Sequence, residues 1–414
     1  MSRQRTPYQW GTGSYAAGAL AWSGTPQISL PLNNYFTPGA TLPAQELNYA
    51  INQHGVSLSS IMAELGSSAA QNWRTALVPN VANFGTADNF QVAGFDQANS
   101  RWYAGTYTAA GTVLQLYTSE DGEGWSTMGN VMNTAGKLCS VVTGLVSGVF
   151  VAATFPGAPG VYLQKLDNLG TNTWVTTDSS SGASATDAEL RTCNFGGSSP
   201  LYVALMSGAF IKTSPDGTTW TSRTVPAALA GITTGFSAAQ SPTSMVAFAR
   251  TANITSCMRT TNGTTWTAVS LGTLIGATDT VFGVAYGDSD GGNCYVACVQ
   301  TSTGSKFLRS TDDGLTWSLA GSFGSYLVTD IAASGTQWVA VTELAATRAS
   351  RTLYSVDAGT TWRRVPAGLS DNVVAGTANY TRPRVWATAP GFVQLNSKLL
   401  RISFAWGQTY TPLA

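Results

Sequence analysis

The chain has 414 residues, of which 43% are hydrophobic and only 10% are charged, whereas about a quarter of the residues are charged in an ordinary globular protein. Lysine plus arginine and aspartate plus glutamate number 21 each, so the formal net charge is zero. This composition predicts a folded protein with a real core, and it argues against a nucleic-acid partner and against membrane insertion, since clustered positive charge and a long apolar run are both missing.

The N-terminal segment is unlike the rest of the chain. Residues 6–42 are rich in Gly, Pro, Thr, Ser and Asn, with scattered aromatic side chains. A stretch of this composition cannot build a core of its own. We therefore expect it to lie extended across a partner or a neighbouring subunit.

A helix is predicted from about residue 43 to residue 65. Pro43 suits a first helical turn and Gly66 suits a helix end. Its seam residues are spaced by four and three, as at the a and d positions of a coiled coil. They are Leu47, Ile51, His54, Leu58, Ile61 and Leu65. The seam predicts a homo-oligomer, with a trimer favoured, or docking into a groove of a partner. Packing against the chain's own C-terminal domain is the alternative.

The stretch from Phe36 to Tyr49 (FTPGATLPAQELNY) resembles a segment near the N-terminus of bacteriophage tail and appendage proteins. In that family an extended strand with proline and glycine leads into a helix that anchors the protein to the virion. The resemblance implies that residues 1–72 form an anchor and oligomerisation domain.

A turn motif then recurs seven times. Its clearest copies are Ser310–Trp317 (STDDGLTW) and Ser355–Trp362 (SVDAGTTW). Looser copies end at residues 125, 174, 220, 266 and 410, so the closing aromatics are spaced by 45 to 51 residues. Asp or Asn followed by Gly marks a tight hairpin turn, and the aromatic side chain begins the next strand and packs inward.

Each repeat also contains short β-rich runs separated by glycine-rich and polar turns, which gives about four strands per repeat. Seven such repeats predict an all-β fold: a seven-bladed β-propeller over residues 73–414, preceded by the extended segment and one α-helix. The outer strand of the last blade has two candidates. Residues 72–79 resemble an outer strand, and residues 410–413 compete for the same place.

The turn motifs resemble Asp-box (BNR) repeats, which occur in sialidases and many other propellers. In that family the Asp box is a structural turn and has no catalytic role. The residues to which the resemblance assigns this role are Asp121, Trp125, Trp174, Asp216, Trp220, Asn262, Trp266, Asp312, Gly314, Trp317, Asp357, Gly359, Trp362 and Tyr410.

Neither a cofactor nor a metal site is predicted. There is one histidine, and the five cysteines form no CxxC pair, so we expect them to be small buried side chains in a protein that folds in a reducing compartment. Sialidase-like catalysis, as implied by resemblance, needs an arginine triad and a tyrosine–glutamate pair. The arginine motif that precedes the first blade in that family is missing here.

One group of charged residues could support acid–base chemistry. Asp187, Glu189 and Arg191 alternate and so share one face of a strand. We interpret them as a solvated strand end with a local ion pair, and we predict no catalytic residue.

The function predicted from the sequence is therefore that of a bacteriophage virion protein of the tail-fibre or appendage type. It would assemble in the host cytoplasm, attach through its N-terminus to other tail or capsid proteins, and present its propeller to a host-surface receptor, with a glycan as the expected ligand. The alternatives are a structural decoration protein of the capsid or tail, and a sialidase-like glycoside hydrolase.

Overall fold

The computed structural model describes residues 74–75, 89–96, 101–107, 115–120, 124–130, 137–142, 150–155, 160–166, 174–181, 187–195, 200–288, 292–324, 326–343, 350–364, 384–388, 391–396 and 399–404. The chain divides into two compact units, Met1–Ser68 and Ala69–Ala414, and all described residues lie in the second. The predicted extended segment and the predicted helix with its seam lie outside the described residues.

The described residues form seven four-stranded antiparallel sheets, which we call blades 1 to 7. Blade 1 contains β2 (Asn89–Asp96), β3 (Arg101–Tyr107), β4 (Gln115–Ser119) and β5 (Ser126–Asn130). Blade 2 contains β6 (Lys137–Val142), β7 (Phe150–Phe155), β8 (Val161–Leu166) and β9 (Trp174–Ser181). Blade 3 contains β10 (Ala188–Cys193), β11 (Leu201–Met206), β12 (Phe210–Ser214) and β13 (Thr221–Arg223).

Blade 4 contains β14 (Phe236–Gln240), β15 (Met245–Ala249), β16 (Ser256–Thr260) and β17 (Thr267–Ser270). Blade 5 contains β18 (Thr280–Gly287), β19 (Cys294–Gln300), β20 (Gly304–Ser310) and β21 (Ser318–Gly324). Blade 6 contains β22 (Leu327–Ser334), β23 (Gln337–Glu343), β24 (Ser350–Ser355) and β25 (Arg363–Arg364). Blade 7 contains β26 (Arg384–Thr388), β27 (Gly391–Asn396) and β28 (Leu399–Phe404), together with β1 (Arg74–Thr75) from the start of the propeller unit.

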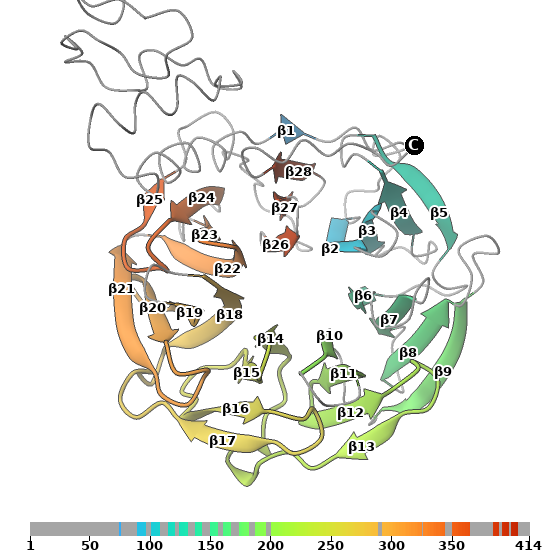
Figure 1. Ribbon diagram of the computed structural model, residues 1–414, viewed down its shortest axis with the longest axis horizontal. Coiled ribbons are helices and arrows are strands. Elements are labelled where there is room, and N and C mark those ends of the chain that lie inside the picture. Colours follow the sequence, from blue (N-terminus) through green and yellow to red (C-terminus); the bar gives the residue numbers. More distant parts are fainter. Residues whose placement is uncertain are drawn as a thin grey trace, which may run out of the picture. The chain divides into compact units, whose positions relative to one another are not determined.

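The blades are arranged in a ring, with the first strand of each blade nearest the axis (Figure 1). Each of these inner strands contacts the inner strand of the next blade, and β26 contacts β2. The prediction of an all-β propeller is confirmed, and the number of sheets equals the number of sequence repeats. The helical content of the described ranges is one 3-10 turn, η4 (Ala227–Leu229). None of the described helices could span a membrane.

Burial across each blade explains the sequence pattern of its strands. The second strands are buried on both faces because they lie between neighbouring blades, so β15 and β19 are almost continuously apolar. The outer strands β17 and β21 are largely exposed, and β21 even exposes the apolar side chain of Leu319. The largest described core cluster extends through blades 3, 4 and 5, so the hydrophobic core lies between the blades.

The ring is closed by the N-terminal strand of the propeller unit. Arg74 pairs with Ile402 and Thr75 pairs with Arg401, which makes β1 the outer strand of blade 7. Of the two candidates from the sequence, the run at residues 72–79 therefore takes this place, whereas residues 410–413 lie outside the described residues. Closing a ring with strands from both parts of the chain leaves no open junction between the first and last blades.

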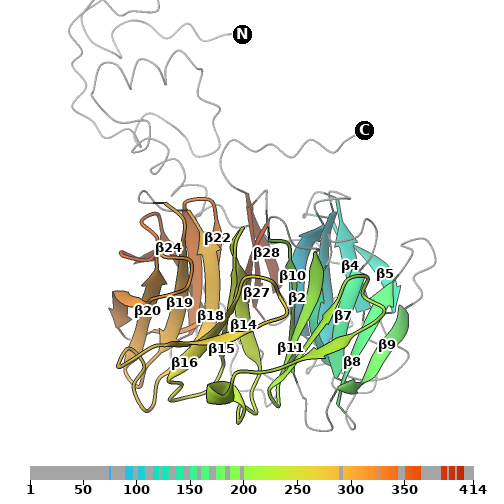
Figure 2. The ribbon, with the colours of Figure 1, turned by 60° about the horizontal axis from the view of Figure 1, so that its bottom comes forward.

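The two ends of the ring carry different connections (Figure 2). At one end, which we call the tip end, the first strand of a blade turns into the second and the third turns into the fourth. At the other end, the crossover end, the second strand leads to the third and the fourth crosses to the next blade. Because β1 is antiparallel to β28, the chain enters blade 7 from the tip end.

Candidate functional site

In blades 3 to 6 the predicted motifs form the third-to-fourth-strand turns, at the tip end. In blade 7 the fourth strand is β1, so the seventh motif does not form such a turn. In blade 5, Ser310 Oγ donates a hydrogen bond to Asp312 Oδ1 (2.8 Å), and the backbone N–H of Gly314 donates to Ser310 Oγ (2.9 Å). Asp312 Oδ1 also accepts the backbone N–H of Thr316 at 2.9 Å. The motif carboxylate is thus used to satisfy the turn's own backbone.

Blade 6 repeats this arrangement. Ser355 Oγ donates to Asp357 Oδ1 at 2.7 Å, and Gly359 N donates to Ser355 Oγ at 3.0 Å. Burial is the largest single influence on the pKa of the Asp357 carboxyl, and it acts to raise that pKa. Several hydrogen bonds together outweigh burial, so the pKa lies below its ordinary value. The same holds for the pKa of Asp312.

Blades 3 and 4 have a shorter version of the turn. Asp216 Oδ1 accepts the backbone N–H groups of Thr218 (2.8 Å) and Thr219 (3.0 Å), which lower the pKa of its carboxyl. Asn262 Oδ1 makes the two equivalent contacts in blade 4. The longer turns of blades 5 and 6 contain one extra residue before the glycine, and this residue has positive φ in both: Asp313 at 61° and Ala358 at 54°.

Each described turn also packs on the preceding blade. A Cβ on Gly217 would lie 2.7 Å from Val151 of blade 2, and a Cβ on Gly314 would overlap Val246 of blade 4.

The aromatic residues that close the turns of blades 5 and 6 also pack on the preceding blade. The Trp317 ring lies 5.0 Å from the Phe248 ring in blade 4, and the Trp362 ring stacks on Phe307 of blade 5 at 4.3 Å. Trp125 and Trp266 are buried, whereas Trp174, Trp220, Trp317 and Trp362 are half-buried. Asp121 and Tyr410 lie outside the described residues.

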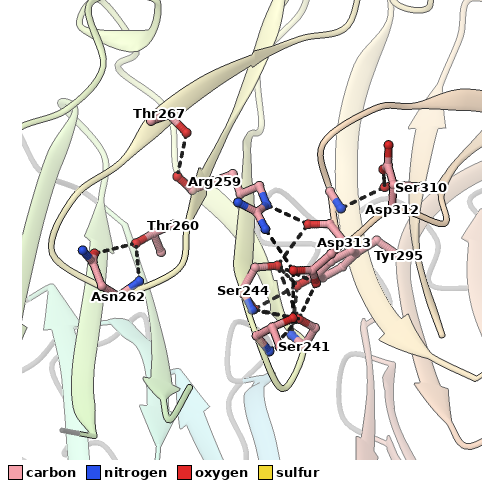
Figure 3. Close-up of polar contacts among 12 residues, drawn as sticks. Ser241, Ser244, Arg259, Thr260, Asn262, Thr267, Tyr295, Ser310, Asp312 and Asp313 are labelled. Carbon is pink, nitrogen blue, oxygen red and sulfur yellow. Dashed lines mark hydrogen bonds and ion pairs between the residues drawn. The ribbon is translucent and has the colours of Figure 1, made fainter. Parts of the chain in front are cut away.

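The extra aspartate of blade 5 is the centre of a polar network between blades 4 and 5 (Figure 3). Its two carboxylate oxygens accept hydrogen bonds from Ser241 Oγ (2.6 Å), Thr243 Oγ1 (2.8 Å) and Ser244 Oγ (2.8 Å). Arg259 Nη2 lies 2.9 Å from Asp313 Oδ2, and Arg259 Nε donates to the Asp313 carbonyl at 2.7 Å. The network joins the tip of blade 5 to the first hairpin of blade 4.

This network controls the ionisation of Asp313. Burial acts to raise the pKa of its carboxyl, but hydrogen bonds from Ser241, Ser244, Thr243 and Arg259 outweigh burial, so the pKa lies below its ordinary value. Tyr295 extends the network by donating to the Ser244 carbonyl at 2.9 Å. Burial raises the pKa of Tyr295 to about 12, so its hydroxyl remains protonated. A protonated tyrosine and an arginine-bound carboxylate make a structural junction.

A second charged group lies at the crossover end, beside the inner strand of blade 3. It consists of Asp187, Glu189, Arg191 and Arg250, which we call the charged cluster. Glu189 Oε1 lies 2.6 Å from Arg191 Nη2, and Glu189 Oε2 lies 3.4 Å from Arg250 Nη2. Arg250 Nη1 lies 3.6 Å from Asp187 Oδ2. Arg250 follows β15 directly, so the cluster joins blade 3 to blade 4.

The charged cluster corrects one interpretation of the sequence. Glu189 was expected at a solvated strand end, but its side chain is only 5% exposed. Burial of this carboxylate is tolerated because a guanidinium group contacts each of its oxygens. Asp187 and Arg191 are more accessible, with side chains 24% and 33% exposed. The cluster therefore combines a buried ion pair with two accessible polar groups.

Side chains also form hydrogen bonds to the backbone between the inner strands of other neighbouring blades. Ser140 Oγ accepts the backbone N–H of Leu190, and Ser237 Oγ accepts that of Val284, both at 3.1 Å. Asp330 Oδ2 accepts the backbone N–H of Val385 at 3.2 Å. Inner strands are sheet edges, so these contacts satisfy backbone groups that would otherwise lack partners in the ring. Arg191 Nε does the same for the Ala238 carbonyl at 2.9 Å.

The five cysteines occupy buried positions and carry free thiols, as expected for small core side chains. Burial raises the pKa of Cys193 and of Cys257 to about 12, so these thiols are protonated and unreactive near neutral pH. Cys294 and Cys298 lie on β19 between blades.

Comparison with solved structures identifies the fold. The chain is similar to YCF48 from Cyanidioschyzon merolae, with a TM-score of 0.56 and 14% identity over 81% of this chain and 99% of that one. It is also similar to the GH74 xyloglucanase from Xanthomonas campestris, with a TM-score of 0.57 and 14% identity over 82% of this chain. The match covers 54% of that enzyme, so the chain spans about half its length. No protein-family model matches the sequence, and no curated protein is significantly similar to it. These likenesses define the class as β-propeller.

Two features of these sites were missed by reasoning from sequence. Arg250 joins the charged cluster from the next blade, and no local spacing relates it to Glu189. The repeat pattern assigns the motif aspartate to Asp312 and gives no role to its neighbour Asp313. The sequence did carry a signal for Asp313, since the STDDG turn of blade 5 holds a second acid where blade 6 has Ala358.

Proposed function

We propose that the chain is a bacteriophage virion protein of the tail-fibre or appendage type, and that its propeller recognises a host-surface glycan. Residues 1–72 attach the protein to other tail or capsid proteins and trimerise it through the seam of the helix at about residues 43–65. The resemblance of residues 36–49 to phage appendage proteins supports this assignment.

The charged cluster is the observation that supports glycan binding by the propeller over glycoside hydrolysis. Glycoside hydrolysis needs one carboxyl group that can donate a proton and another that can act as base or nucleophile. Glu189 is held by two guanidinium groups, which between them occupy both of its oxygens. Partly exposed guanidinium and carboxylate groups on a rigid strand are instead suited to bind hydroxyl groups by hydrogen bonds.

The proposal is tested with the purified full-length protein and with the particle that carries it. We expect the protein to bind the isolated envelope polysaccharide of the host without releasing reducing ends. We also expect particles that lack residues 73–414 to assemble and to fail in adsorption. As a control for attachment, a variant with Leu58→Asp should leave the propeller folded but should not join particles.

Each alternative has its own outcome. Release of sugar, abolished by Glu189→Gln, would establish a glycoside hydrolase. Normal adsorption of particles without the propeller, together with lowered particle stability, would establish a decoration protein. Either result would overturn the recognition proposal.

A further inference from the structure

The chain contains a single Asn–Gly step, Asn262–Gly263, and it lies in the turn between β16 and β17 of blade 4. In such a step the backbone nitrogen of glycine can attack the side-chain amide carbon Cγ of asparagine, because no Cβ obstructs its approach. A bond forms between this nitrogen and Cγ, the Cγ–Nδ2 bond breaks, and ammonia leaves with the proton of the attacking nitrogen. Water then opens the resulting succinimide to aspartate or isoaspartate. Asn262 is exposed, so water can reach it.

The turn opposes the first step of this reaction. The attacking nitrogen belongs to a buried glycine, and its N–H donates a hydrogen bond to Thr260 Oγ1 at 2.9 Å. The Gly263 carbonyl accepts a hydrogen bond from Trp266 Nε1 at 3.2 Å, which fixes the glycine from its other side. The nitrogen must lose its proton as it attacks, so a hydrogen bond that holds this proton in a buried residue protects the amide.

Hydrogen bonds also restrict the side-chain amide, which is the other reacting group. Asn262 Oδ1 accepts the backbone N–H groups of Thr264 at 2.9 Å and Thr265 at 2.8 Å. Thr260 Oγ1 donates to the same oxygen at 3.2 Å (Figure 3). Three donors on one oxygen limit the rotation by which Cγ could reach the glycine nitrogen. Thr260 Oγ1 therefore restrains both reacting groups, and removing it should release both.

Blade 3 indicates which product this turn can accommodate. Asp216 occupies the position of Asn262, and its Oδ1 accepts the backbone N–H groups of the two equivalent threonines at 2.8 and 3.0 Å. An aspartate product should therefore keep the turn. An isoaspartate product should not, because its main chain runs through the former side chain and the acceptor for these N–H groups is displaced.

We propose that Asn262 is a site of spontaneous deamidation, and that the hydrogen bonds of Thr260 Oγ1 slow the reaction in the folded protein. Thr260 acts as a positioning residue, since it holds the two reacting groups and exchanges no atom with them. This chemistry is independent of the proposed function. Because the chain has a formal net charge of zero, each conversion to aspartate or isoaspartate adds one negative charge to it.

The test follows the full-length protein at mildly alkaline pH by peptide mass spectrometry, with chromatography to separate aspartate from isoaspartate. We expect Asn262 to deamidate at least roughly 10-fold more slowly in the folded protein than in guanidinium chloride, because several hydrogen bonds of the turn must open first. Thr260→Val removes the hydroxyl at nearly constant shape, and the folded variant should deamidate roughly 2- to 10-fold faster than wild type. Thr260→Ser keeps a hydroxyl and should restore the slow rate.

Asn253 is the matched control in the same samples. It is exposed and lies between β15 and β16 of blade 4, but Ile254 follows it, and the isoleucine side chain hinders attack by the backbone nitrogen. Circular dichroism shows whether each variant is folded. Equal rates at Asn262 in folded and unfolded wild type would overturn protection by the turn, whether or not Thr260→Val folds. A folded Thr260→Val protein that deamidates as slowly as wild type would refute the role of Thr260. Faster deamidation at Asn253 than at Asn262 in guanidinium chloride would refute the assignment of the site.

Discussion

Two acidic residues that are adjacent in sequence have different roles in the tip of blade 5. Asp312 satisfies the backbone of its own turn, whereas Asp313 connects the turn to Ser241, Ser244 and Arg259 of blade 4. Blade 6 has Ala358 at the position of Asp313 with nearly the same φ, so the turn itself does not require the second acid. The Asp313 side chain therefore serves the junction between blades.

Replacing Asp313 with alanine should destabilise the propeller more than replacing Asp312 does. Asp313→Ala removes the carboxylate that pairs with the half-buried Arg259 and accepts hydrogen bonds from two serine hydroxyls, so we expect a loss of about 2–3 kcal/mol in the free energy of unfolding. Asp312→Ala removes contacts within an exposed turn and should cost about 1 kcal/mol. Urea unfolding of the two variants measures the difference, and equal losses would contradict a special role for Asp313.

The contribution of Asp313 should also depend on pH. Its pKa is lower in the folded protein than its ordinary value of about 3.9. The carboxylate therefore stabilises the fold fully above that value, and this stabilisation is lost as the pH falls through the lower pKa of the folded state. The difference in unfolding free energy between wild type and Asp313→Asn should be constant near neutral pH and shrink below about pH 4. If the difference in unfolding free energy between the two proteins grew as the pH fell, this prediction would be wrong.

The tip turns act as connectors between blades because each glycine lies against the second strand of the preceding blade. A Cβ at position 314 would overlap Val246, and Gly314 also has φ +85°, so both packing and backbone conformation require glycine there. At Gly272, φ is +55° but no atom lies within 4 Å of the place that a Cβ would take, so backbone conformation alone requires glycine. Comparing Gly314 with Gly272 therefore separates the steric effect of a Cβ from the effect of backbone conformation.

Gly314→Ala should therefore cost more than Gly272→Ala. We expect about 1–2 kcal/mol at position 272 from the left-handed backbone alone. At position 314 a steric cost of about 1–3 kcal/mol should be added, because the methyl group must displace blade 4. Thermal unfolding of both variants gives the comparison. Similar losses would show that the tip of blade 5 can move away from blade 4 freely.

The arrangement of strands could be predicted from the sequence because the repeat is local. Asp or Asn, Gly and an aromatic at fixed offsets mark each turn, and the β-rich runs between turns supply the strands. Contacts between blades are not local, which is why the partnership of Glu189 with Arg250 could not be read from spacing. The sequence also does not determine ring closure, since residues 72–79 and 410–413 are both candidates for the outer strand and only the assembled ring distinguishes them.

At the scale of the whole molecule, closure by β1 makes residues next to Arg74 part of the propeller. Deleting residues 1–72 keeps β1, and this variant should melt as the full-length propeller does. Deleting residues 1–79 removes β1 and uncovers the edge of β28, which should cost at least about 1–2 kcal/mol from the lost backbone hydrogen bonds. Removing residues 410–414 is the matched control and should leave the thermal midpoint unchanged, because β1 already occupies the outer place of blade 7. Calorimetry of the three truncations tests which end of the chain closes the ring. If deleting residues 410–414 lowered the thermal midpoint and deleting residues 1–79 did not, the outer strand of blade 7 would come from the C-terminal end of the chain.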